Sequence, residues 1–215
     1  MKNIEWADLT INAVVGCPRG CPYCYAKKIN DRFHFVEDFA EPKSFRNRLE
    51  KIYRIKNKKI FMNSMSDITY WSHWITRIVL ETIKDNPKNK YYFLTKDLYF
   101  FEKCSSKIAP WIFDIITYKN VFVGLTVTTQ QEWDSYIRNM SAFKLINIEP
   151  ILEPIDLFKN YNPNKKLIKK IILGAETGNR KEKVIPKKEW IENIIKFCKE
   201  YNIELFLKEN IKKYL

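Results

Sequence analysis

The sequence alternates apolar runs of strand length with longer amphipathic segments, and this alternation restricts the possible folds. Several runs are apolar almost without interruption, as expected of strands covered on both faces of a parallel sheet. Alternation of such strands with helices is typical of α/β proteins. We therefore predict an α/β fold, a small or incomplete (β/α) barrel of six to seven parallel strands. The candidate strands are residues 9–15, 59–63, 91–95, 121–127, 143–149, 170–175 and 203–208.

The segments between these strands have the periodicity of helices. Apolar residues recur in them at intervals of three and four, which places those residues on one helical face. The candidate helices are residues 25–33, 73–85, 96–108 and 187–201. In a (β/α) barrel the chemistry takes place at the carboxyl ends of the strands, so the residues that follow each strand deserve the closest inspection.

Every predicted strand is followed by polar residues. Charged side chains occur at several of these ends, including Glu149, Glu176 and Lys208. Any one of them is most simply a turn residue or a helix cap, but their repetition at successive strand ends favours a ligand-binding site.

The chain is basic, with 38 Lys and Arg against 25 Asp and Glu and a net charge of +13. A basic protein often binds nucleic acid. Lys far outnumbers Arg, however, and occurs with Asn and Ile throughout, a bias that an AT-rich genome alone produces. Nucleic acid is therefore the less favoured partner.

No apolar run is long enough to span a membrane. Glu5 and Asp8 stand where a signal peptide would have its apolar core. We therefore expect a cytoplasmic protein that does not interact with membranes.

Three of the five cysteines fall within eight residues, in the pattern C-x3-C-x2-C formed by Cys17, Cys21 and Cys24. In a long intracellular chain such clustering indicates metal binding or catalysis more than a disulfide framework. The other two, Cys104 and Cys198, lie in helix-like segments and are expected to be buried thiols.

Two interpretations of the cysteine loop compete. A structural zinc site needs four ligands, and His34 is the nearest candidate for the fourth. A [4Fe-4S] cluster is usually held by four cysteines, so three would leave one iron open to a substrate or cofactor. Gly16 and Gly20 allow turns with positive φ that let the thiols converge. The lack of a second C-x2-C pair disfavours a zinc ribbon, and the position after the first strand favours catalysis.

The C-x3-C-x2-C pattern, with Tyr23 before its third cysteine, resembles the signature of the radical S-adenosylmethionine (radical SAM) superfamily. The resemblance implies a single radical SAM domain over residues 1–215, with one [4Fe-4S] cluster on Cys17, Cys21 and Cys24. The open iron would chelate SAM, and one electron would cleave SAM to methionine and a 5′-deoxyadenosyl radical that abstracts hydrogen from the substrate. An electron donor such as flavodoxin or ferredoxin is the implied protein partner.

The same resemblance suggests further positions that bind SAM. The superfamily's Gly-Gly-Glu segment at the end of the second strand is replaced here by Asn63, Ser64 and Ser66, whose oxygens can accept hydrogen bonds from the SAM ammonium. Thr126 and Thr128 match the polar residues that usually end the fourth strand.

A closer resemblance covers most of the chain. It is similar to a radical SAM-like family carried by phages and bacteria, and to queuine lyases, which cleave the base queuine and release 7-aminomethyl-7-deazaguanine (preQ1) in queuosine precursor salvage. The residues that carry it are Ile4–Trp6, Phe61–Asp67, Phe93–Lys96, Gly124–Val127, Ile148–Leu157 and Gly174–Gly178.

If the substrate is a small 7-deazaguanine base, acidic side chains suit it. Asp67, Glu149 and Glu176 are expected to bind the guanine-like edge and the secondary amine, and Lys96 and Lys208 to transfer protons or bind the SAM carboxylate. The expected reaction is hydrogen abstraction from the cyclopentenediol followed by C–N cleavage.

Aromatic side chains are expected to stack on the deazapurine ring. The candidates are Trp6, Tyr70 and Trp71. Two alternatives stay open at this point, namely a radical SAM enzyme that modifies tRNA or repairs nucleic acid, and a non-catalytic zinc-binding module.

Overall fold

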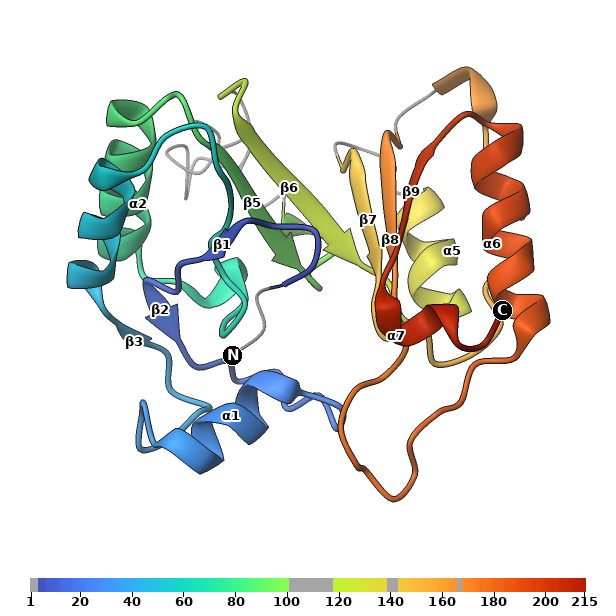
Figure 1. The fold of residues 1–215 in the computed structure, drawn as a ribbon, viewed down its shortest axis with the longest axis horizontal. Coiled ribbons are helices and arrows are strands. Elements are labelled where there is room, and N and C mark those ends of the chain that lie inside the picture. Colours follow the sequence, from blue (N-terminus) through green and yellow to red (C-terminus); the bar gives the residue numbers. More distant parts are fainter. Residues whose placement is uncertain (1–3, 101–117, 139–142, 166–167) are drawn as a thin grey trace. The chain divides into compact units, whose positions relative to one another are not determined.

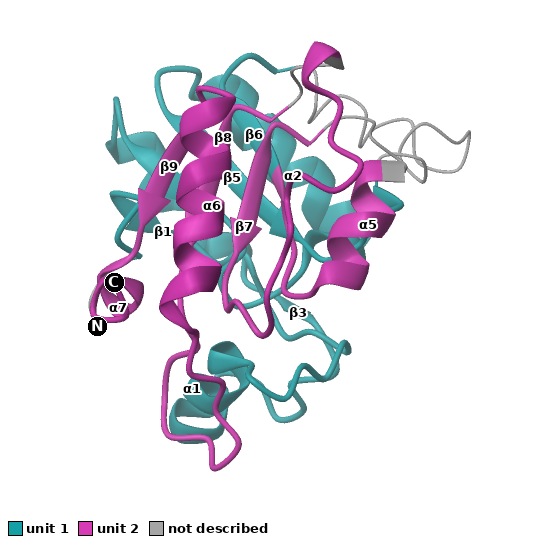
Figure 2. Cartoon of the chain, turned by 90° about the vertical axis from the view of Figure 1, so that its right-hand side faces the viewer, with its two compact units in different colours: residues 1–123 teal, residues 124–215 magenta. Residues whose placement is uncertain are grey.

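The computed structural model describes residues 4–100, 118–138, 143–165 and 168–215. The chain divides into two compact units, residues 1–123 and 124–215 (Figure 2). The boundary falls within strand β6 (Val121–Thr126), so each unit is described by itself.

Unit 1 contains three short parallel strands, β1 (Leu9–Thr10), β4 (Lys59–Phe61) and β5 (Lys90–Thr95) (Figure 1). A separate antiparallel pair is formed by β2 (Val14–Val15) and β3 (Lys43–Ser44). The predicted strand 9–15 was therefore wrong as a single element, because its two halves join different sheets.

Asn12 explains this break. Its side chain exchanges hydrogen bonds with the Ser64 hydroxyl at 3.0 and 3.1 Å and accepts one from the Met65 amide at 3.2 Å. The amide of Phe45 donates to the carbonyl of Ala13 at 2.7 Å. These partners turn the chain between β1 and β2 and direct β2 toward the cysteine loop.

The helices of unit 1 are α1 (Tyr25–Phe33) and α2 (His73–Asp85), with the 3-10 helices η1 (Arg46–Arg54) and η2 (Ile68–Tyr70). Both α-helices have the predicted bounds. The apolar stripe of α2 is buried as its periodicity requires. Of the predicted helix 96–108, residues 96–99 form a bend and a turn, Phe100 is helical, and residues 101–108 lie outside the described part.

Unit 2 contains the end of β6 and the parallel strands β7 (Leu145–Ile148), β8 (Lys170–Leu173) and β9 (Glu204–Leu207). Helices α5 (Gln130–Arg138) and α6 (Lys188–Glu200) cover the same face of these strands (Figure 2). Two short elements complete the unit, η3 (Pro163–Lys165) and α7 (Glu209–Lys212).

The strand order in the larger sheet is β1-β4-β5-β6-β7-β8-β9, and the described pairings are parallel. The prediction of an α/β fold with about seven parallel strands is confirmed. All four residues of β7 are buried, which explains why this strand has no polar alternation. Among the described helices, none has the length and apolarity needed to cross a membrane.

Candidate functional site

The cysteine loop begins directly after β2. Gly16 has a φ of 115°, and its amide donates to the Met65 carbonyl at 2.9 Å. A Cβ at this position would lie 2.9 Å from the Cα of Pro42, so only glycine fits. Gly20 also has a positive φ, of 67°. The predicted positive φ of both glycines is confirmed.

The three thiols of the loop are partly buried, and all three are free. The Cys24 sulfur accepts a hydrogen bond from the Lys27 amide at 3.4 Å and so caps α1. The pKa of the Cys17 thiol is raised from 9.0 to about 11, chiefly by burial and to a lesser extent by the charges of Asp67 and the other two thiols, against the opposing effect of a hydrogen bond from the Arg19 backbone. Burial also raises the pKa of Cys24. Cys17 and Cys24 pack against an apolar cluster formed by Val15, Ala26, Val36, Phe39 and Met65.

These thiols suit a soft metal centre in number and type. The charges of Cys21 and Cys24 are both among the causes of the raised pKa of Cys17, so the three thiols are near one another. Within the described ranges, however, no three His, Cys, Asp or Glu side chains are gathered tightly enough to hold a metal ion. The sulfurs would therefore have to draw together around a cluster.

The fourth zinc ligand suggested by sequence does not lie in the loop. His34 is exposed and ends α1 in the left-handed conformation, with a φ of 50°. Cys198 is buried in α6, as predicted, whereas Cys104 lies outside the described residues.

Asp67 joins the cysteine loop to the strand ends beside it. Its carboxylate accepts hydrogen bonds from the Thr95 hydroxyl at 2.7 Å, the Lys96 amide at 2.9 Å and the Thr69 amide at 3.1 Å. Arg19, in the middle of the loop, approaches the same carboxylate with Nε at 3.9 Å. These contacts show that Asp67 holds neighbouring backbone and side chains in place, and its predicted contact with substrate stays a prediction. Sequence reasoning missed Arg19, whose only signal is its place between two cysteines.

Lys96 places a charged group in a buried position of unit 1. Its ammonium is buried and has no hydrogen-bond partner among the described residues. It lies 5.3 Å from the ring centroid of Tyr23 in the cysteine loop. The ring stabilises the cation only in part, and a buried charge without a partner is unfavourable. An anionic ligand group would complete this environment.

The polar residues after β4 are already engaged by protein groups. Asn63 spans both backbone groups of Leu94, donating at 2.6 Å and accepting at 3.0 Å. Ser64 bonds to Asn12, and the Ser66 hydroxyl accepts from the indole of Trp71 at 2.9 Å. The three side chains predicted to bind SAM therefore hold this turn in shape.

The three aromatic candidates differ in accessibility. Trp6 is buried against Phe61 and Tyr92, and Trp71 is buried edge-on to Phe93. Tyr70 is 37% exposed, with the Arg19 guanidinium 6.0 Å from its ring centroid. Of the three, Tyr70 alone presents an exposed ring.

In unit 2, Lys208 and Glu149 form an ion pair at the ends of β9 and β7. Gly174 follows β8 between them. A Cβ on Gly174 would lie 3.0 Å from Cδ of Lys208 and 3.1 Å from Cγ of Glu149. Because glycine has no side chain, Gly174 leaves room for the Lys208–Glu149 pair. The sequence alone did not reveal this requirement.

Two further polar side chains, Thr126 and Asn147, lie at the ends of β6 and β7. Asn147 donates to the Thr126 hydroxyl at 3.4 Å, while its own carbonyl oxygen is buried without a partner in the described part of the chain. Thr128 instead donates its hydroxyl to Glu132 at 2.9 Å, near the start of α5. Of the two predicted threonines, Thr126 is thus the more available, and Asn147 lies beside it.

Glu176 is buried and held by Arg180. The guanidinium donates to both carboxylate oxygens, at 2.8 and 2.9 Å, and the Val184 amide donates at 3.3 Å. This paired arrangement orders the turn after β8. A direct contact between Glu176 and a substrate would require Arg180 to move away.

The fold and the loop together define an α/β protein with a parallel sheet and a three-thiol loop beside the ends of β4 and β5. The chain belongs to the family described as "Protein of unknown function (DUF5131)", whose family model matches residues 1–212. No curated protein and no solved structure matched the chain.

Proposed function

We propose that this protein is a radical SAM enzyme, and specifically a queuine lyase that releases 7-aminomethyl-7-deazaguanine. The observation that carries the proposal is the three-thiol loop with the buried, unpartnered ammonium of Lys96 beside it. The finer fold assignment, a partial barrel of radical SAM type, is part of this proposal.

Cys17, Cys21 and Cys24 would hold one [4Fe-4S] cluster, which together with SAM supplies a 5′-deoxyadenosyl radical when bound. Lys96 would neutralise the SAM carboxylate, because its ammonium has no protein acceptor among the described residues. Arg19 and Asp67 fix the loop relative to the ends of β4 and β5.

We assign substrate binding to the ion pair of unit 2, which Lys208 and Glu149 form. Glu149 would accept the N–H groups of the guanine-like edge, and Lys208 would pair with that carboxylate and deliver or remove a proton. Asn147 offers its unpartnered oxygen to a hydroxyl or N–H donor. Glu176 and Asp67 act through the residues they position.

The test begins with anaerobic reconstitution with iron and sulfide. The reconstituted protein is expected to bind about four irons per chain and to absorb visible light. Once reduced, it should cleave SAM to 5′-deoxyadenosine. Addition of queuine should then give 7-aminomethyl-7-deazaguanine. A colourless protein with about one zinc and no SAM cleavage would contradict the radical SAM assignment. SAM cleavage that queuine neither stimulates nor converts into product would contradict the substrate.

A further inference from the structure

The positive charge of the chain is concentrated in one short segment. Residues 43–59, which we name the basic segment, contain eight Lys and Arg and a single acidic residue, Glu50. That gives a net charge of +7, more than half of the +13 of the whole chain. The segment comprises β3, η1 and the turn that leads to β4.

Most of these cations are exposed and lack an ionic partner. Lys43 pairs with Glu41 at 3.1 Å. No ion pair connects the other seven cations of the segment to any described residue. Six of the seven are exposed, namely Arg46, Lys51, Arg54, Lys56, Lys58 and Lys59. On α6, by contrast, Lys188 has an ion-pair partner in Glu192. The basic segment therefore presents a strong positive field to an approaching molecule.

The surface of the segment is hollowed as well as charged. A depression of about 720 Å³ is lined by Arg48, Lys51 and Arg54 together with Asn12, Asn47 and Glu50. Forked guanidinium groups bind carboxylates in pairs of hydrogen bonds. Such a concave basic surface suits acidic side chains that protrude from a partner.

The basic segment is built onto the scaffold that carries the thiols. β3 pairs with β2, the strand that leads into the cysteine loop. Phe45 packs against the same apolar cluster as Cys17 and Cys24. Arg48 fixes η1 to this scaffold, since its guanidinium lies 4.1 Å from the Phe45 ring centroid and donates to the Asn12 carbonyl at 3.0 Å.

We propose that the basic segment is the docking surface for an acidic electron-carrier protein of the flavodoxin or ferredoxin class. The inference rests on the proposed function, which requires one electron from outside the chain. In the docked complex the reduced carrier loses one electron and the oxidised cluster gains it, with no transfer of a proton or group. A donor must approach the cluster closely, and this surface shares the scaffold of the thiols.

Nucleic acid is the rival occupant. Tyr53, 55% exposed between Lys51 and Arg54, offers a ring on which a base would stack. The protein donor is favoured because Arg48, which lines the depression, stacks on Phe45, and Phe45 packs against the apolar cluster that also holds Cys17 and Cys24. An RNA arm in the experiment separates the two.

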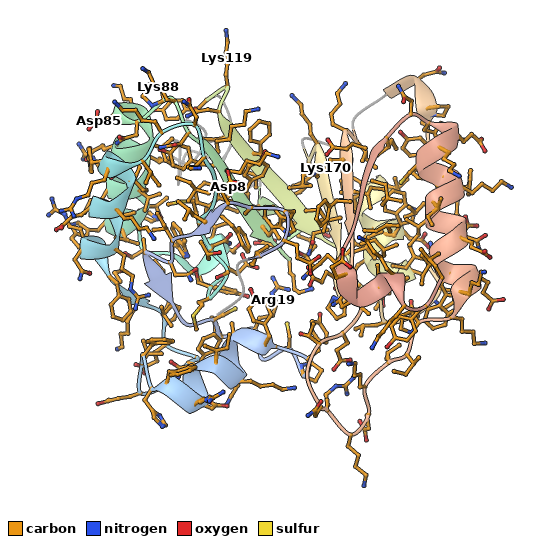
Figure 3. The ribbon with its side chains drawn as sticks, in the orientation of Figure 1. Asp8, Arg19, Asp85, Lys88, Lys119 and Lys170 are labelled. Atoms are coloured by element: carbon orange, nitrogen blue, oxygen red, sulfur yellow. The ribbon has the colours of Figure 1, made fainter. Side chains whose placement is uncertain are left out.

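The test compares two double charge reversals in the full chain. Lys51→Glu with Arg54→Glu alters the basic segment. Lys196→Glu with Lys199→Glu is the matched control, because both lysines are exposed, have the same spacing along the chain as Lys51 and Arg54, and lie on α6, outside the basic segment; Figure 3 draws the side chains of this helix. Binding of oxidised flavodoxin and of tRNA is measured by calorimetry at low salt, and SAM cleavage is measured with reduced flavodoxin and with dithionite.

The basic-segment variant should bind flavodoxin at least tenfold more weakly and lose a similar factor in flavodoxin-driven SAM cleavage. Dithionite-driven cleavage and the control variant should match the wild type, and raising the salt should weaken binding. The proposal is overturned if flavodoxin does not bind, if the reversal leaves its binding unchanged, or if the reversal abolishes only tRNA binding. Absence of SAM cleavage with dithionite would count against the proposed function alone, because calorimetry still decides the docking.

Discussion

Lys96 in unit 1 and Lys208 in unit 2 both follow a parallel strand directly, yet their environments differ. The ammonium of Lys208 is neutralised by Glu149, whereas that of Lys96 is buried with only an aromatic ring nearby. The charge of the paired lysine is already balanced within the protein. The unpaired lysine is unfavourable in the free protein, and under the proposed function the SAM carboxylate would supply the missing anion.

The largest loss of activity is expected when a cysteine of the loop is replaced, because the roles proposed for Lys96 and Lys208 both require the cluster. Cys17→Ala should abolish binding of the iron–sulfur cluster and with it all SAM cleavage, because a three-cysteine set has no ligand to spare. Iron content and visible absorption measure the effect. Cys198→Ala is the control, since Cys198 is buried in α6, and it should keep full iron content. Retention of the cluster by Cys17→Ala would show that the ligands lie elsewhere.

Lys96→Met tests the unpaired charge. It should weaken SAM binding by about 30-fold, equivalent to about 2 kcal/mol, because a charge-assisted hydrogen bond is lost. The same variant should unfold at equal or higher denaturant concentration, because a buried charge without a partner is removed. Calorimetry measures the affinity for SAM, and unfolding in urea measures the free energy of unfolding. A clear loss of stability with unchanged SAM affinity would mean that Lys96 is a structural residue.

Lys208→Met should lower stability, in contrast to Lys96→Met. It leaves the partly buried Glu149 carboxylate without its cation, which should lower the free energy of unfolding by about 2 kcal/mol. Urea unfolding of Lys96→Met and Lys208→Met side by side gives the sharpest form of the comparison. Equal shifts in both variants would remove the distinction between the two lysines.

Gly174→Ala should act on the same pair without removing a charge. The added methyl group meets Lys208 and Glu149 at contact distances that force both to shift, at a cost of about 1 to 2 kcal/mol. Thermal unfolding measures it. In the Lys208→Met background the penalty should shrink, because one of the two obstructing side chains is more flexible there. A full penalty in both backgrounds would place the strain in the backbone.

The last effect concerns pH and is seen only in alkaline solution. The pKa of the Cys17 thiol is raised from 9.0 to about 11 in the folded chain, so the folded state holds its proton more tightly than the unfolded state. The corresponding stability is complete below pH 9 and is lost as the pH rises toward 11. Unfolding of the metal-free protein should therefore become easier over this window, and less so in Cys17→Ala. A flat profile in both proteins would contradict the raised pKa.

Local patterns predicted much of this fold. The bounds of α1 and α2 follow from periodicity and from the caps at Cys24 and Ser72. Helix α5 was missed because its polar sequence hides the buried Trp133 and Tyr136. The break between β1 and β2 depends on Asn12 bonding to Ser64, 52 residues away, which no local pattern reveals.

The candidate site divides along the same line. Spacing predicted that the three cysteines form one site, and the strand-end rule singled out Glu149 and Lys208, which the structure brings together as an ion pair. Sequence could not show that Glu176 is occupied by Arg180, because an i,i+4 pair outside a helix gives no periodic signal. Nor could it show that Trp6 is in the core, since an aromatic residue serves packing and stacking equally well.

The cap of α1 would also affect the reduction potential of a cluster bound to Cys24. The Cys24 sulfur accepts the Lys27 amide at the first turn of a nine-residue helix, where the positive end of the helix dipole lies. An N–H donor and a positive dipole at a ligand sulfur both favour the more negative, reduced form of an iron–sulfur centre. The start of α1 would thus raise the reduction potential of a cluster bound here, so that a helix terminus, as well as the sulfur ligands, sets how readily the protein accepts an electron.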